Sequence, residues 1–156
     1  IQNERDVRVQ RLAGKIDRVL VDAPCSGTGT LRRNPDIKWR AIDVEKLVAA
    51  QRAILASAST LLKPGGRMVY ATCSLLREEN DTLVANFLAT HPEFALLPAE
   101  EILARRHVTL PVEVSRSRPA PASEVAGENF LKGSLRLFPH RHGTDSFYAV
   151  AMERRS

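Results

Sequence analysis

Short apolar runs alternate with longer helical stripes along the first hundred residues, and this alternation restricts the fold more than any other feature. The short runs, which predict buried strands, are residues 18–21, 67–71 and 94–98. Between the first two, apolar residues recur at helical spacing from Val44 to Leu62, interrupted only by Gln51, and Asp43 is a candidate N-cap. A second helical stripe covers 83–88. Strands alternating with helices predict an α/β fold, a parallel sheet covered by helices.

The segments that follow these units are less regular. "KPGG" at 63–66 combines proline and glycine, which predicts the end of the first helix. Residues 100–106 predict a short helix, and the proline-containing segment 111–134 predicts a loop. Apolar segments at 135–138 and 146–153 flank a turn-rich connector, so we expect them to pair as antiparallel strands.

Composition limits the location and the partners of the chain. Its 156 residues are enough for one domain or part of one. No apolar run approaches the ~20 residues that span a bilayer, and the polar start lacks a signal segment, so we expect a cytoplasmic protein without membrane partners. The net charge of +5 is compatible with a polyanionic partner such as nucleic acid, and equally with an ordinary basic surface.

Two cysteines follow two of the predicted strands. Cys25 lies in "DAPCSGTG" just after the first strand, and Cys73 lies in "YATCS" just after the second. Parallel strands joined by one crossover helix are usually neighbours, about 4.8 Å apart. Ligands of open α/β sheets bind at the carboxyl ends of the strands. We therefore expect both thiols in one crevice at that edge.

Several kinds of thiol chemistry fit this sequence poorly. A disulfide is unexpected inside the cell, and the four histidines have no metal-ligand spacing with the cysteines, so no metal is expected. A phosphatase loop needs arginine six positions after its cysteine, where this chain has Leu31. No motif places a histidine base for a thiol protease. A thiol nucleophile that attacks a heterocycle remains open.

Four stretches resemble the RNA cytosine-5 methyltransferases of the Sun/Nop (RsmB-like) family. They are "DAPCSGTG" at 22–29, "RRNPDIKWR" at 32–40, "LLKPGGRMVYATCSLLREEN" at 61–80 and the closing "FPHRHGTDSFYAVAMERR". The resemblance covers nearly the whole chain and implies the later portion of a Rossmann-like class I methyltransferase sheet, with an antiparallel final strand. One departure is Ser146, where family members commonly have glycine.

The resemblance also implies a mechanism with S-adenosylmethionine (SAM) as the cofactor. In the family, the cysteine that matches Cys73 bonds to carbon 6 of cytosine and thereby activates carbon 5 for methylation. The cysteine that matches Cys25 assists loss of the carbon 5 proton and release of the product. Asp22 corresponds to a carboxylate that faces cofactor and base, although an aspartate here could also cap a turn. The implied substrate is RNA, with ribosomal RNA preferred and transfer RNA as the alternative.

The segment after Cys25 leaves its own alternatives. The glycines of Gly27-Thr28-Gly29 predict a tight turn beside the substrate rather than a phosphate loop. Four basic residues follow and could contact an RNA backbone or form an ordinary polar loop. These are Arg32, Arg33, Lys38 and Arg40. Trp39 could stack on a base, but a packing role is favoured.

One element expected of such a domain is missing. A glycine-rich SAM loop should precede the strand at 18–21, but residues 1–16 contain only Gly14. The RNA-binding extension common in the family is absent as well. We therefore expect 1–156 to be a partial catalytic domain whose open sheet edge invites self-association. A non-catalytic RNA-binding fragment is the alternative to an active enzyme.

Overall fold

The computed structural model describes residues 7–108 and 131–155, which are built around one five-stranded sheet. The strands are β1 (Ile16–Asp22), β2 (Leu62–Thr72), β3 (Phe94–Leu97), β4 (Leu135–Leu137) and β5 (Phe147–Arg154). Their order is β1-β2-β5-β3, and β4 pairs with β5. β1 and β2 are parallel, whereas β5 is antiparallel to β2, β3 and β4. The predicted α/β fold with an antiparallel final strand is confirmed.

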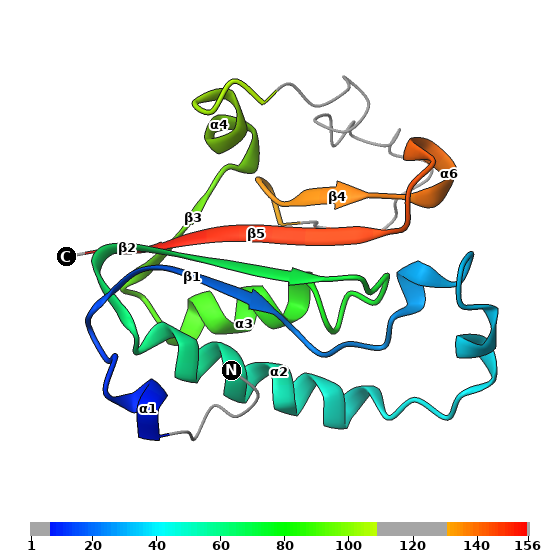
Figure 1. Ribbon diagram of the computed structural model, residues 1–156, viewed down its shortest axis with the longest axis horizontal. Helices are drawn as coiled ribbons and strands as arrows, with labels where there is room; N and C mark the ends of the chain where they lie inside the picture. Colours follow the sequence, from blue (N-terminus) through cyan, green and yellow to red (C-terminus); the bar gives the residue numbers. More distant parts are fainter. Residues whose placement is uncertain (1–6, 109–130, 156) are drawn as a thin grey trace.

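Helices connect the strands, and the two longest of them cover one face of the sheet (Figure 1). The α-helices are α1 (Val7–Gln10), α2 (Val44–Ser59), α3 (Asp81–Thr90), α4 (Ala99–Ala104) and α6 (Pro139–His142), and the 3-10 helices are η1 (Thr28–Thr30) and η2 (Pro35–Trp39). The two longest, α2 and α3, touch each other beneath the strands. In the parts of the chain that the structure describes, no helix has the length and apolar character needed to cross a membrane.

The ends of α2 show one success and one error of prediction. Asp43 caps the helix as expected, because its carboxylate accepts the backbone N–H of Lys46 at 2.9 Å. The helix ends at Ser59, however, and β2 already begins at Leu62, which pairs with Ile16. "KPGG" therefore lies inside β2, where the partner of β1 jumps from residue 62 to residue 67. The glycines and proline form a bulge in a strand, rather than the end of the helix.

Strand β5 separates two strands that the sequence places one after the other. β3 follows β2 along the chain and runs in the same direction, but β5 lies between them. Alternate residues of β5 point to the helices, where Tyr148, Val150 and Met152 are all buried. The apolar face of β5 thus completes the core between the α2–α3 layer and the sheet.

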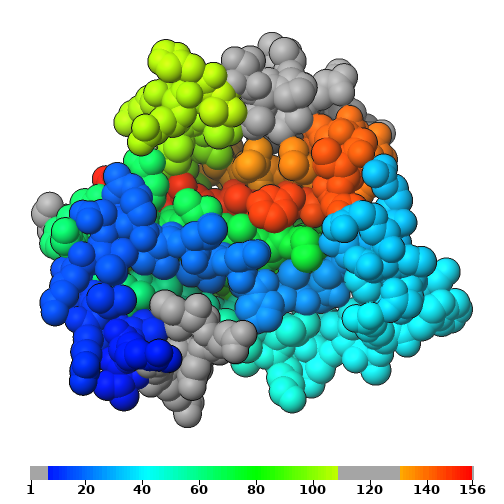
Figure 2. Space-filling view, viewed as in Figure 1, coloured from blue at the N-terminus to red at the C-terminus, as the bar shows by residue number. Residues whose placement is uncertain are grey.

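The core is one-sided in the described ranges. Its cluster joins side chains from four strands with both long helices, including Met68, Tyr70, Leu55 and Phe87. On the opposite face, Leu20 of β1 is 71% exposed. β1 is also the outermost strand, and its atoms lie at the surface in Figure 2. Parallel sheets are normally covered on both faces, whereas this face and the outer edge of β1 are uncovered in the described residues. That residues 1–156 form a partial domain stays a prediction.

Most of the remaining predictions are confirmed. The segments at 135–138 and 146–153 pair antiparallel as β4 and β5, with the short helix α6 in their connector. The predicted helix at 100–106 is α4, which begins and ends slightly earlier. The predicted loop at 111–134 lies outside the described residues except for its last four positions.

Candidate active site

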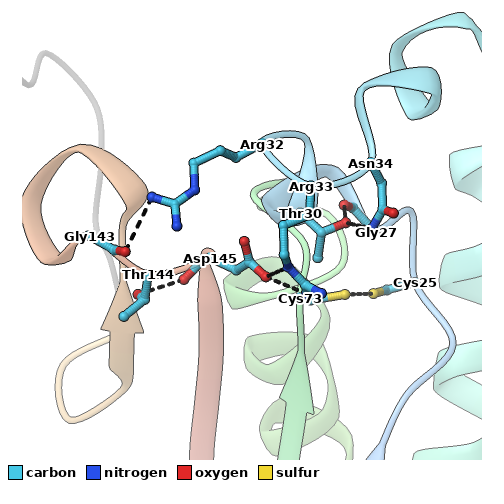
Figure 3. Close-up of polar contacts among 10 residues, drawn as sticks. All are labelled: Cys25, Gly27, Thr30, Arg32, Arg33, Asn34, Cys73, Gly143, Thr144 and Asp145. Atoms are coloured by element: carbon cyan, nitrogen blue, oxygen red, sulfur yellow. Dashed lines mark hydrogen bonds and ion pairs between the residues drawn. The ribbon is translucent and has the colours of Figure 1, made fainter.

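The structure brings the two cysteines together at the carboxyl ends of neighbouring parallel strands. Cys73 directly follows β2, and Cys25 lies three residues after β1. Their Sγ atoms are 3.4 Å apart, and both thiols are free and half-buried (Figure 3). The expectation that both sulfurs share one edge of the sheet is confirmed. Two thiols in contact can share a proton and can act on the same bound molecule.

A tight turn places the first cysteine against the second. Gly27 adopts the left-handed conformation with φ of 72°, which glycine alone adopts at no steric cost. Gly29 donates its N–H to the carbonyl oxygen of Cys73 at 2.8 Å. A Cβ at position 29 would lie 2.5 Å from that oxygen, so only glycine permits this approach. The predicted tight turn is confirmed, and it is closed against the loop of Cys73.

Ser146, which stands where family members commonly have glycine, does not disturb this turn. The residue is only 3% exposed, and its N–H donates to the carbonyl oxygen of Gly29 at 2.9 Å. Its hydroxyl donates to the carbonyl oxygen of Leu137 in β4 at 2.9 Å. The extra side chain therefore points toward β4 and its polar atom is satisfied there.

Glu79, which was not predicted as a site residue, links the loops that carry the two cysteines. It is fully buried and accepts hydrogen bonds from Ser26 and Ser74, each of which directly follows a cysteine. Gln51 of α2 donates to the same carboxylate at 2.9 Å. The signal that could have revealed this cluster was Gln51 itself, because a polar residue in an apolar helical stripe needs a buried partner.

The surroundings of the Cys25 thiol disfavour its charged form. Burial raises the pKa of the Cys25 thiol to about 11, and the adjacent Cys73 thiol adds to this effect. Desolvation disfavours the thiolate, which is the charged form. Cys25 is therefore protonated at neutral pH and can donate a hydrogen bond to the sulfur of Cys73.

Asp22 stands apart from the cysteine pair. It is the last residue of β1 and is exposed, and within the described ranges its side chain makes no hydrogen bond or ion pair. The structure thus gives no support to a turn-capping role. An exposed carboxylate at the carboxyl end of a strand fits one wall of a SAM site, since it can accept hydrogen bonds from a ligand. The rest of such a pocket would lie beyond the free edge of β1.

The basic segment after the glycine turn is partly tied to the rest of the site. Arg33 forms an ion pair with Asp145, and Arg32 donates to the carbonyl oxygen of Gly143 at 3.3 Å (Figure 3). Trp39 is 81% exposed, and the Nζ of Lys38 lies 5.1 Å from its ring centroid. The favoured packing role of Trp39 is therefore wrong for this chain, because its ring touches too little of the core to be buried.

Comparisons with known proteins match the chain to a methyltransferase family. Residues 2–153 match the family described as 16S rRNA methyltransferase RsmB/F. The chain is 50% identical over 101 residues to the ribosomal RNA small subunit methyltransferase B of Sodalis glossinidius, covering 64% of this chain and 23% of that protein. It is 38% identical over 144 residues to a probable ribosomal RNA small subunit methyltransferase B of Bacillus subtilis, covering 90% and 28%.

A solved structure supports the same relationship. The crystal structure of NSun6 from Pyrococcus horikoshii with SFG superposes with a TM-score of 0.67 at 25% identity, covering 99% of this chain and 34% of that chain. This likeness confirms the Rossmann-like methyltransferase fold. The chain spans about a quarter of the length of these curated relatives. With its family match over nearly the whole sequence, the chain belongs to the RsmB/F family of 16S rRNA methyltransferases.

Proposed function

We propose that this chain is the later part of the catalytic domain of a longer enzyme that methylates carbon 5 of cytosine in RNA, with ribosomal RNA as the substrate. The observation that carries the proposal is the 3.4 Å separation of the two sulfurs at the carboxyl edge of the sheet. Family membership supports the reaction class and the RNA substrate. The cytosine target rests on the resemblance of the two cysteine motifs.

In this proposal, Cys73 is the nucleophile. Its thiolate forms a bond from Sγ to carbon 6 of cytosine, which moves an electron pair toward carbon 5. Cys25 is protonated beside it and hydrogen-bonds to the Cys73 sulfur, so it can stabilise the thiolate charge before attack. After methylation the Cys25 thiol gives its own proton to solvent, and its thiolate then accepts the proton of carbon 5. The electron pair of that carbon–hydrogen bond re-forms the double bond between carbons 5 and 6. The bond to carbon 6 then breaks and its electron pair returns to Cys73.

When bound, SAM supplies the methyl group as part of a sulfonium. Asp22 is the residue of this chain that would hold it, because its carboxylate is exposed at the end of the edge strand. We expect the isolated 156-residue chain to bind SAM weakly or not at all, whereas the full-length protein binds it. Calorimetric titration of both measures this difference, and tight stoichiometric binding by the isolated chain would contradict the partial-domain proposal.

A non-catalytic RNA-binding fragment is the second candidate for the chain alone. The free edge of β1 and the exposure of Leu20 favour it, because a SAM pocket needs walls on both sides. The same edge predicts self-association of the isolated chain. A transfer RNA substrate and a cytoplasmic location stay predictions.

Mass spectrometry tests the proposed reaction. The full-length protein is incubated with isotopically labelled SAM and either ribosomal RNA or transfer RNA, and digested fragments are mapped to nucleotide and atom. We expect the label on carbon 5 of a cytosine in 16S rRNA. Label on another base, or on a ring nitrogen or ribose oxygen, would contradict the roles of both cysteines, and label on transfer RNA alone would change the substrate.

A further inference from the structure

The carboxylate of Glu79 is saturated with hydrogen bonds although it is fully buried. One oxygen accepts from the backbone N–H of Ser26 and from the side-chain amide of Gln51, both at 2.9 Å. The other accepts from the hydroxyls of Ser26 and Ser74, both at 2.5 Å. Four donors match the four lone-pair directions of a carboxylate. A buried carboxylate without hydrogen-bond partners would destabilise the fold. Because each lone pair of Glu79 has a donor, the cluster is a specific feature of this fold.

Three of the four donors come from the two segments that carry the thiols, and the fourth is Gln51 of α2. Ser26 directly follows Cys25, and Ser74 directly follows Cys73. The two hydroxyls also lie 3.0 Å from each other, and the hydroxyl of Thr28 is within 3.3 Å of both. A single carboxylate therefore holds two loops that come from different strands, one residue beyond each sulfur.

Glu79 is itself fixed from behind. Its backbone carbonyl accepts the buried hydroxyl of Tyr70, a core residue of β2, at 2.7 Å. The next residue, Asn80, donates its side-chain amide to the carbonyl oxygen of Ser74 at 2.9 Å and accepts the hydroxyl of Thr72 at 2.6 Å. The carboxylate is thus anchored to the centre of the sheet rather than to a movable loop.

From this geometry we infer that Glu79 is a positioning residue that sets the spacing of Cys25 and Cys73. It touches neither sulfur, and it acts through Ser26 and Ser74. Its effect on methylation rests on the proposed function, because that function assigns the two thiols to successive steps on one base. Its effect on the spacing of the sulfurs does not.

Thiol oxidation measures the spacing without RNA or cofactor. The full-length protein is treated with diamide, an azo oxidant that takes up two hydrogens as the two thiols become a disulfide, and the Cys25–Cys73 bridge is followed by peptide mass spectrometry. We expect Glu79→Ala to form the bridge about tenfold more slowly, the equivalent of one lost charge-assisted hydrogen bond. Glu79→Gln should restore most of the rate, because its amide can still bond to both serines.

Asp81→Ala is the matched control. Asp81 is also a buried carboxylate near the start of α3, but it bonds to Leu131 and Arg136, away from the thiols. Asp81→Ala should lower the midpoint of unfolding without slowing formation of the Cys25–Cys73 disulfide. If Glu79→Ala oxidises at the wild-type rate, or Asp81→Ala slows oxidation equally, the positioning role is wrong.

A milder pair of variants decides the matter if Glu79→Ala does not fold. Ser74→Ala removes one donor of the cluster, and Ser59→Ala removes the hydroxyl of another buried serine, which bonds within α2. Ser74→Ala should slow formation of the disulfide and Ser59→Ala should not.

Methylation assays separate the positioning role of Glu79 from the proposed function. In Glu79→Ala, kcat should fall while the KM for SAM is unchanged, and if wild-type protein does not methylate cytosine, the proposed function fails while the oxidation result still stands.

Discussion

The strands that precede the two cysteines differ in how many neighbouring strands they have and in how deeply they are buried. β2, which leads to Cys73, lies between β1 and β5, and its Met68 and Tyr70 are fully buried. β1, which leads to Cys25, has one neighbour and carries Leu20 at 71% exposure. The half of the site after β2 is held by the core. The half after β1 is held by contacts with the first half, among them the hydrogen bond from Gly29 to Cys73. In this site, the loop after β2 is fixed by the core, and the loop after β1 depends on the loop after β2 for its position.

The largest expected effect separates the chemical roles of the two thiols. Cys73→Ala in the full-length enzyme should abolish turnover and leave no covalent RNA adduct, because no nucleophile reaches carbon 6. Cys25→Ala should permit attack and methyl transfer but slow release, so that an adduct accumulates. A denaturing gel after incubation with substrate RNA and SAM measures both. An adduct with Cys73→Ala and none with Cys25→Ala would reverse the assignment.

Stability should show the same contrast between the strands. Met68→Ala in β2 should lower the free energy of unfolding by about 2–5 kcal/mol, because it opens a cavity in a fully buried site. Leu20→Ala in β1 should change it by less than about 0.5 kcal/mol in the isolated chain, because the side chain is mostly in water. Urea titration of both variants provides the measurement. Equal losses would mean that the exposed face of β1 is covered in solution.

A smaller effect on RNA binding is expected at Trp39, which lies in the segment that follows Cys25. Its exposed ring suits stacking on an unpaired base, and such stacking contributes about 1–3 kcal/mol. Trp39→Ala should weaken RNA binding by the full-length protein accordingly, whereas Trp39→Phe should keep most of the affinity. Leu75, which is 44% exposed after Cys73, offers a matched alanine control. Fluorescence anisotropy at constant salt measures all three, and unchanged binding by Trp39→Ala would remove it from the RNA surface.

The smallest effect concerns protonation of Cys25. Its pKa is raised from the ordinary 9.0 to about 11, so its alkylation by iodoacetamide should keep accelerating until the pH approaches 11. Because the folded pKa is the higher one, the neutral thiol stabilises the fold fully below pH 9.0, and this contribution is lost as the pH rises through about 11. Cys73→Ala should move the midpoint down. Peptide mass spectrometry of each alkylated cysteine checks this, and a midpoint at 9.0 in the wild-type protein would contradict burial of the thiol.

Local patterns predicted the elements and the meeting of the cysteines, because both depend on chain order and periodicity. The strand order was not accessible in this way. β5 enters between β2 and β3 through pairing across the sheet, and nothing within residues 147–154 specifies which strands it will join. The bulge at 63–66 was missed for a related reason, since proline and glycine end helices and interrupt strands alike.

The site shows the same limit. Cys25 and Cys73 were identifiable because each comes soon after a predicted strand and because their motifs resemble a known family. Glu79 lies in "LREEN", where charged residues suggest a solvated turn, and only the folded chain brings serines from two loops to its carboxylate. Trp39 was misjudged because tryptophan is usually buried, and its local sequence does not show that η2 buries Ile37 and leaves Trp39 exposed.

The place of β5 has a consequence for biosynthesis. It pairs with β2, β3 and β4, yet the ribosome makes it after all three. A nascent chain halted before Phe147 has an unpaired edge on β2 and no partner for β3, and it leaves the apolar surface under α2 and α3 open. Contacts so distant in sequence close slowly, and unpaired edges aggregate. The emergence of β5 from the exit tunnel therefore decides when the edges of β2 and β3 are sealed.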